Sequence, residues 1–192
     1  MNDSEIIQSV LNGKHHNFRI LVEKYQQKVF SVAMGFVHEK EDAEDITQEI
    51  LLNAWKSLKF FRGNSSFSTW LHRIAVNACL NHTRKNKGTV LTRFSSFFGY
   101  EGMRQVDIPL YEENPEEIII KKEHSEWLQK ALDSLSEKQH TAIVLSKYED
   151  LSQREISEIM NITEGAVESL IQRARKNLRE KLLSVSGKRK TA

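Results

Sequence analysis

The sequence predicts an all-α protein, and three observations support this. Only 2 Pro and 8 Gly occur in 192 residues, so helix breakers are scarce. Apolar residues recur at three- and four-residue steps in several segments, which is the spacing of one helix face. Alternating β-branched runs, which indicate strands, are few. We therefore expect two small helical domains joined by a flexible linker, with a helix-turn-helix in the C-terminal domain.

The first domain is expected over residues 1–87. A short helix can end by Gly13, and a long amphipathic helix follows up to a break near His38. Two further helices are predicted over residues 41–58 and 67–85, with a short loop between them. Four helices of this length can bury a modest core of their own.

Residues 88–117 are expected to form the linker, because helical periodicity fails there and Gly, Pro and acidic residues gather. The second domain is then expected over residues 118–192. Seven apolar residues should pack against its helix-turn-helix: Trp127, Leu128, Ala131, Leu132, Ile143, Val144 and Leu145.

The helix-turn-helix is predicted over residues 151–178. Ser152 and Glu155 have the spacing of a capping box, and the helix that they begin should end near Asn161. Thr163 stands where the N-cap of a second, longer helix belongs. The expected inward stripe of that longer helix comprises Val167, Leu170, Ile171, Ala174, Leu178 and Leu182.

The opposite face of the longer helix carries side chains that can read DNA bases. Gln can bond adenine twice, Ser and Glu can bond other base edges, and Arg or Lys can hold guanine or phosphate. Together with the N-cap and the edges of this face, the predicted DNA-contacting residues are Thr163, Gly165, Glu168, Ser169, Gln172, Arg173 and Lys176. An ordinary solvated hairpin would explain the same residues about as well. The excess of Lys and Arg over residues 173–190 favours DNA, and predicts salt-sensitive binding.

The outward face of the 41–58 helix suits a protein partner. Its members are Asp45, Gln48, Glu49 and Leu52, so an apolar side chain stands in an acidic field. A single exposed leucine is normal on any helix. The acids nevertheless continue past the first helical turn, which favours a site for a basic partner helix.

The loop before the 67–85 helix holds aromatic, cationic and small polar residues, which can stack and bond an unstacked base. Individually, Phe60, Phe61 and Trp70 are better explained as core residues. The surface of the 67–85 helix should be basic and amide-bearing. Seven residues are expected outside its core face: Thr69, His72, Arg73, Val76, Asn77, Thr83 and Arg84.

Composition excludes some classes of protein. The net charge of +2 says little about partners, and the single Cys79 allows neither an intramolecular disulfide nor a zinc cluster. Without a signal peptide or an apolar stretch of membrane-spanning length, the chain should be soluble and cytosolic. An acid-base or metal site built from Asp42, Glu44, Asp45 or His72 is disfavoured, because a matching His pair, a phosphate loop and a nucleophile elbow are all lacking. We expect no enzyme activity, cofactor or metal.

Three stretches together resemble the extracytoplasmic-function sigma factors of bacterial RNA polymerase. They are DAEDITQEILLNAWKSL, FRGNSSFSTWLHRIAVNACLNHTRK and SLSEKQHTAIVLSKYEDLSQREISEIMNITEGAVESLIQRARKNLREKL, which cover both expected domains in order. The resemblance implies that the first domain, region 2, docks on the polymerase clamp coiled coil. Asp45, Gln48, Glu49 and Leu52 fall on the matching helix.

The resemblance also implies two DNA contacts. Region 2 would melt the minus-10 element and capture a flipped base through Phe61, Arg62, Asn64, Ser65, Ser66, Arg73, Asn77 and Asn81. Region 4 would read the minus-35 element through the helix-turn-helix and touch the polymerase flap. An anti-sigma factor commonly restrains such proteins. A helix-turn-helix regulator that dimerises and acts without polymerase is the rival hypothesis, since it would bind palindromic duplex sites unaided.

Overall fold

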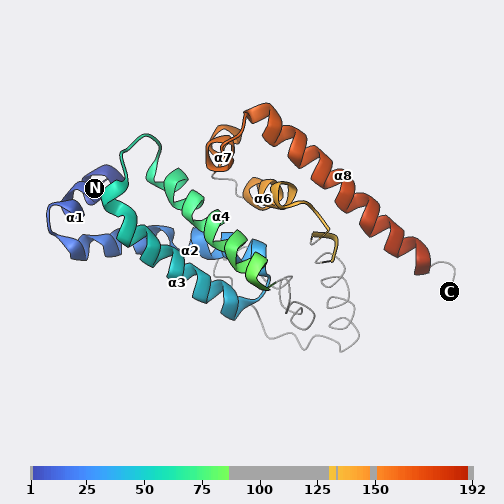
Figure 1. Cartoon of the computed structure of the whole chain (residues 1–192), viewed down its shortest axis with the longest axis horizontal. Helices are drawn as coiled ribbons and strands as arrows, with labels where there is room; N and C mark the ends of the chain where they lie inside the picture. The colour runs from blue at the N-terminus through green and yellow to red at the C-terminus, as the bar shows by residue number, and fades with distance from the viewer. Residues whose placement is uncertain (1, 87–129, 133, 148–150, 190–192) are drawn as a thin grey trace, which may run out of the picture.

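The computed structural model describes residues 2–86, 130–132, 134–147 and 151–189 (Figure 1). These residues form helices, turns and short irregular segments with no strand, so the all-α prediction is confirmed. The predicted linker over 88–117 lies outside the described residues. So do Trp127, Leu128 and the predicted start of the second domain at residue 118.

Four α-helices build the N-terminal half, and α2 lies at its centre. They are α1 (Asp3–Leu11), α2 (Phe18–Val37), α3 (Lys40–Ser57) and α4 (Phe67–Asn86), with one-turn 3₁₀ helices η1 (His15–Asn17) and η2 (Leu58–Phe60). α2 packs against both α3 and α4. The core between them is apolar and closed to solvent, with Leu21, Val29, Ile46, Ile50 and Leu71 almost fully buried.

Local sequence signals set the ends of these helices. Asn2 caps α1: its side chain accepts from the Glu5 backbone N–H at 2.8 Å, and the Glu5 carboxylate accepts from the Asn2 backbone in return. α2 ends at His38, whose φ of 60° places it in the left-handed region that stops a helix. The predicted break near His38 is therefore confirmed.

The C-terminal half contains α6 (Glu137–Ser146), α7 (Gln153–Met160) and α8 (Glu164–Arg189). Ser152 and Glu155 form the predicted capping box at the start of α7, and Asn161 ends that helix with a φ of 53°. α8 packs against α6 and α7. The helix-turn-helix is thus present where the sequence predicts it.

One member of the predicted α8 stripe is misplaced. Val167, Ile171 and Ala174 are buried as expected, but 38% of Leu182 is exposed. Figure 1 shows the last turns of α8 projecting past α6 and α7, so neither of these two helices covers its apolar side there. The prediction that Leu182 faces a core is wrong for this reason.

The two halves also pack on one another. α6 contacts α2, and α7 contacts α4, so that one continuous apolar cluster runs through both halves. Thr69, His72 and Val76, expected outside the α4 core face, are at most 7% exposed. That expectation is wrong because α4 has a second packed side. In the part of the chain that the structure describes, no helix is long and apolar enough to cross a membrane.

Candidate nucleic-acid interface

The DNA-reading face predicted on α8 is formed and open to solvent. Thr163 caps the helix, because its Oγ1 accepts from the Ala166 backbone N–H at 3.2 Å. Val167, Ile171 and Ala174 fix the rotation of α8 by inserting into the core. The residues turned outward are all exposed: Thr163, Gly165, Glu168, Ser169, Gln172, Arg173 and Lys176. The fold therefore gathers the whole predicted set on one surface.

Hydrogen bonds within this face orient two of its readers. The Gln172 Nε2 amide donates to Glu168 Oε1 at 3.2 Å, which leaves its second N–H and its carbonyl oxygen for a base. Arg173 donates through Nε to the Ser169 carbonyl at 3.0 Å, so both of its terminal nitrogens remain available. The Nζ atom of Lys176 lies 3.9 Å from Oε1 of Glu180 on the next turn of the helix. Such exposed pairs are weak, and a phosphate can replace the partner.

The loop over residues 61–66 combines anchored and accessible groups. Phe61 is half-buried, with its ring centroid 5.3 Å from that of Trp70 and 5.9 Å from that of Phe67. Ser66 Oγ accepts from the Thr69 backbone N–H at 3.0 Å and so caps the start of α4. Arg62 and Asn64 are exposed, and Ser65 is partly exposed. The aromatic cluster therefore holds the loop while its polar tip faces water.

Phe60 departs from the prediction. It was expected in the core, yet it is 68% exposed, with Lys59 Nζ lying 5.0 Å from its ring centroid. The rest of the cluster, with Tyr25 against Phe67, already fills the space beneath the loop. Phe60 is thus an exposed aromatic ring beside the polar tip, and a run of two adjacent Phe residues gave no signal as to which one points outward.

Three of the residues predicted to contact the minus-10 element lie on one side of α4 at four-residue steps, namely Arg73, Asn77 and Asn81. Asn77 and Asn81 are exposed. Arg73 is half-buried, because its Nε donates to the Glu158 carbonyl of α7 at 2.9 Å. The loop and the two asparagines are therefore open to solvent, whereas Arg73 is hydrogen-bonded to α7 in the other half of the chain.

The α3 face is fully formed. Gln48 and Glu49 lie three and four residues after Asp45, and Leu52 lies three and four residues after them, so the four share one side of the helix, and all four are exposed. Leu52 is the most exposed of the apolar residues on α3, at 56%. Ile46, Ile50 and Ala54 anchor the opposite side in the core. The face is an acidic surface around a leucine, held by a rigid helix.

The residues weighed as an enzyme site do not form a metal cage. Among the residues that the structure describes, no three His, Cys, Asp or Glu side chains are grouped to hold a metal ion. His72 donates through Nδ1 to the Ser68 carbonyl at 2.7 Å. Burial lowers the pKa of His72, which keeps it a neutral member of the packed α4 side. Cys79 is buried, and burial raises the pKa of its thiol to about 12.

Known proteins match the chain over both halves. Residues 21–89 match the family described as Sigma-70 region 2, and residues 125–178 match Sigma-70, region 4. The RNA polymerase sigma-H factor of Pseudomonas aeruginosa is 33% identical over 179 residues, covering 90% of this chain and 90% of its own. The ECF RNA polymerase sigma factor SigW of Bacillus subtilis is 33% identical over 177 residues, covering 92% and 94%.

A solved structure shares the fold. The sigma factor RpoE from Bartonella quintana, in complex with the anti-sigma factor NepR, superposes with a TM-score of 0.61. The superposition covers 86% of this chain and 96% of that chain, at 22% identity.

Proposed function

The chain belongs to the extracytoplasmic-function sigma factors of the sigma-70 family, and we propose that it directs RNA polymerase to promoters through a minus-35 and a minus-10 element. The observation that carries the proposal is the outward face of α8: seven predicted DNA-contacting residues stand exposed together on the second helix of a helix-turn-helix. Members of this family act in transcription initiation and lend promoter specificity to the polymerase.

Recognition of minus-35 uses α8 in a major groove. Gln172 keeps one N–H and its carbonyl oxygen free, which matches the N7 and N6 groups of adenine. Arg173 offers its terminal nitrogens to guanine or phosphate, and Lys176 offers a point charge to phosphate. The basic helix thus combines base contacts, which select sequence, with phosphate contacts, which position the domain.

Recognition of minus-10 uses the loop before α4. Arg62, Asn64 and Ser65 supply polar groups for the edge of an unstacked base, and Phe60 supplies an exposed ring on which a base can stack. The Phe61 cluster makes the loop rigid, so little ordering is needed when DNA binds. Capture of an unstacked base stabilises the open duplex and in this way assists melting.

Polymerase binding uses the α3 face. Its acidic residues and Leu52 fit a basic helical partner with an apolar spot, which is the kind of surface we assign to the clamp coiled coil. The helix-turn-helix domain would touch the flap. The proposed domain limits are residues 1–87 and 118–192, and the proposed site of action is the bacterial cytoplasm, where polymerase and promoters are found.

An anti-sigma factor is a further proposed partner. The similar sigma factor RpoE is solved in complex with the anti-sigma factor NepR. The exposed faces of α3 and α8 would be natural targets for such a protein, because covering either one prevents a contact that initiation needs.

A binding assay distinguishes the sigma factor from a free-standing regulator. Purified chain is mixed with promoter duplex from its source genome, with and without core polymerase, and retardation of the DNA is measured. We expect a specific complex only when core is present, on sites with two unlike elements. A specific complex on symmetric duplex without core would instead establish the dimeric regulator. Gln172→Ala should weaken the specific complex. Gln26→Ala, which changes an exposed glutamine on α2, should not.

A further inference from the structure

The first residue of α1 holds a tyrosine that packs against the base of the loop over residues 61–66. Tyr25 of α2 is 5% exposed, and its hydroxyl donates to Asp3 Oδ2 at 2.5 Å. Lys24 Nζ donates to the other carboxylate oxygen, Oδ1, at 2.6 Å. A phenylalanine would fill the same space without needing an acceptor, because a buried hydroxyl is costly when it lacks one. The Asp3 junction, formed by Asp3, Lys24 and Tyr25, therefore joins α2 to the start of α1.

Charge strengthens the Asp3 junction. Burial would raise the pKa of Asp3, but the hydrogen bonds from Lys24 and Tyr25 outweigh it and lower this pKa, so the carboxylate is ionised. Burial, and then the hydrogen bond to Asp3, raise the pKa of Tyr25 to about 12, so its hydroxyl keeps the proton that it donates. A hydrogen bond to an ionised acceptor is roughly twice as strong as a neutral one. The Tyr25 ring is thereby held in one orientation.

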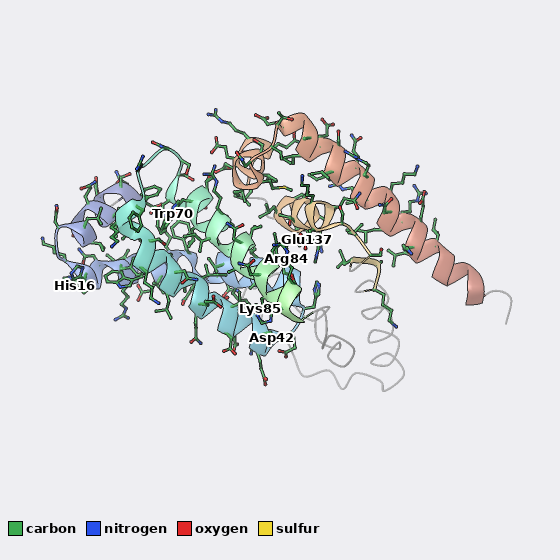
Figure 2. All side chains as sticks on the ribbon, viewed as in Figure 1. His16, Asp42, Trp70, Arg84, Lys85 and Glu137 are labelled. Carbon is green, nitrogen blue, oxygen red and sulfur yellow. The ribbon has the colours of Figure 1, made fainter. Side chains whose placement is uncertain are left out.

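The Tyr25 ring contacts the residue at which the loop ends. Its centroid lies 5.3 Å from that of Phe67, the first residue of α4, with the planes 63° apart. Phe67 lies edge-on to Phe61, at the start of the loop, with centroids 5.9 Å apart. Trp70, labelled in Figure 2 close to the loop, packs on Phe61 at 5.3 Å and on Phe67 at 5.6 Å. The two ends of the loop are thus fixed to each other and to Tyr25.

The same N-terminal helix also contacts the segment that enters the loop. α1 packs against η2, whose last residue, Phe60, directly precedes the loop. Three buried residues anchor α1 in the core, namely Ile6, Ile7 and Val10. α1 therefore supports both ends of the loop, one directly and the other through Tyr25.

The tip of the loop depends on these two ends. Gly63, with a φ of 73°, turns the chain there in the left-handed region that favours glycine. A Cβ added at Gly63 would meet nothing within 4 Å, so no neighbouring segment packs on the loop at this residue. Arg62 and Asn64 stand on either side of the turn and are exposed. Their position is therefore set through the base of the loop.

We propose that Tyr25, held by Asp3 and Lys24, is a positioning residue for the loop that captures the minus-10 base. Tyr25 touches no DNA itself and acts through Phe67. This inference rests on the proposed function, in which the loop binds an unstacked base. A loop that is already in place loses little conformational freedom on binding, whereas a loosely held one must first be ordered. Breaking the Asp3 junction should therefore loosen the loop and slow the opening of promoter DNA.

The first measurement follows the loop in the free, full-length protein. Asn64 in the loop and Glu44, exposed near the start of α3, are replaced by cysteine and spin-labelled, while buried Cys79 stays unlabelled. Pulsed electron resonance should give a narrow distance distribution for the parent. Asp3→Ala should broaden this distribution, because it removes the acceptor of the Tyr25 hydroxyl.

A double-mutant cycle shows whether Asp3 acts through Tyr25. Tyr25→Phe keeps the ring but lacks the hydroxyl, so it should broaden the distribution as well, and Asp3→Ala should add nothing to it. Circular dichroism should show the helix content of the parent in Tyr25→Phe, whose ring still fills the core. Glu23→Ala is the matched control, since it removes a carboxylate that pairs with Arg19 on the exposed side of α2. It should leave the distribution unchanged.

The second measurement follows promoter opening by the holoenzyme. Core polymerase with parent or variant chain is mixed, at saturating concentration, with promoter duplex from the source genome that carries 2-aminopurine in the minus-10 element. The rise in fluorescence reports unstacking. Asp3→Ala and Tyr25→Phe should slow this rise by about tenfold or less, because a hydrogen bond to a charged group contributes about that factor and only part of it reaches the loop. Their affinity for the unopened duplex should match that of the parent, and Glu23→Ala should open DNA at the parent rate.

The two measurements separate this proposal from the proposed function. A distance distribution that stays narrow in both Asp3→Ala and Tyr25→Phe would overturn the positioning role of Tyr25. So would opening at the parent rate by both variants. If the parent holoenzyme opened no promoter, the proposed function would fail, and the distance measurement alone would still decide whether the Asp3 junction positions the loop.

Discussion

Individual side chains on α8 are expected to divide the work of DNA recognition. The Gln172 amide donates to Glu168, which leaves one N–H and its carbonyl oxygen for the base that we propose it reads, so Gln172→Ala should relax sequence choice at one minus-35 position. The loss of one bidentate contact costs about 1–3 kcal/mol of discrimination. Binding of the holoenzyme to a panel of single-base minus-35 variants measures this, with Gln26→Ala as control. Unchanged preference at every position would show that Gln172 reads no base.

Lys176 is expected to contribute charge without sequence choice. Lys176→Ala should weaken binding to all promoters alike, and should reduce the slope of log affinity against log salt by about 0.9, the value for one phosphate contact. Titrations of holoenzyme with one promoter at several salt concentrations give that slope. Lys14→Ala, an exposed lysine on the other half, is the control. If Lys176→Ala and the parent gave the same slope of log affinity against log salt, Lys176 would make no phosphate contact.

His140 is expected to make the contact between the two halves of the chain sensitive to pH. Burial lowers its pKa when the halves are in contact, although its hydrogen bond to Gly35 opposes that effect. Its neighbour His38 is neutral in the same range, because burial, then His140 and Lys147, lower the pKa of His38 to about 3. The separated state therefore binds more protons than the state in which the halves are in contact.

Because the separated state binds more protons, a fall in pH favours separation of the two halves. The contribution of His140 to the contact between the two halves is fully present above pH of about 6.5, the ordinary histidine value, and weakens by up to about 1.4 kcal/mol per pH unit as the pH falls below it. The distance between spin labels placed at Lys56→Cys on α3 and Arg179→Cys on α8 should lengthen as the pH falls from 7.5 to 5.5, a range in which carboxylates stay charged. His140→Gln can keep the bond to Gly35 without titrating, so its response should be smaller. A parent distance that is constant over this range would contradict the prediction.

At the scale of elements, the best-predicted features are those that a single helix encodes. Capping at Ser152 and Thr163, the stop at Asn161 and the buried stripe at Val167 depend on neighbours three or four residues away, and each is confirmed. They also fix which face of α8 is exposed. The roles of those exposed residues in binding DNA remain predictions.

The wrong expectations depend on how the helices pack on one another, which periodicity within one helix does not report. Periodicity assigned α4 one buried face, but His72 and Val76 are also buried, and α4 contacts α7, which lies some 80 positions later, as well as α2 and α3. Phe60 and Phe61 are adjacent and chemically identical, and only the cluster with Trp70 decides which one is packed. A helical pattern cannot report a second contact surface, because it records the rotation of one helix and not its neighbours.

The α3 face gives an element-scale prediction. Leu52→Asp should weaken binding to core polymerase by about tenfold or more, since a desolvated charge replaces an apolar contact while the fold is untouched. Gel filtration or fluorescence titration with core measures the affinity. Leu11→Asp, an exposed leucine on α1, should bind like the parent. If both variants bind core as the parent does, α3 is not the docking helix.

At the scale of the whole molecule, the two proposed DNA-binding surfaces would gain from being joined. Once polymerase holds the chain, contact at one element raises the effective concentration of the other module at the second. Neither surface then needs high affinity alone, which agrees with the small number of side chains on each.

Mapping transcription start sites in vitro tests the central claim most directly. Purified chain and core polymerase are incubated with fragments of the source genome, and the 5′ ends of the transcripts are sequenced. The account predicts starts that require both components, with two unlike elements upstream at a fixed spacing. Core polymerase initiating at the same positions without the chain, or no new starts when it is added, would contradict it.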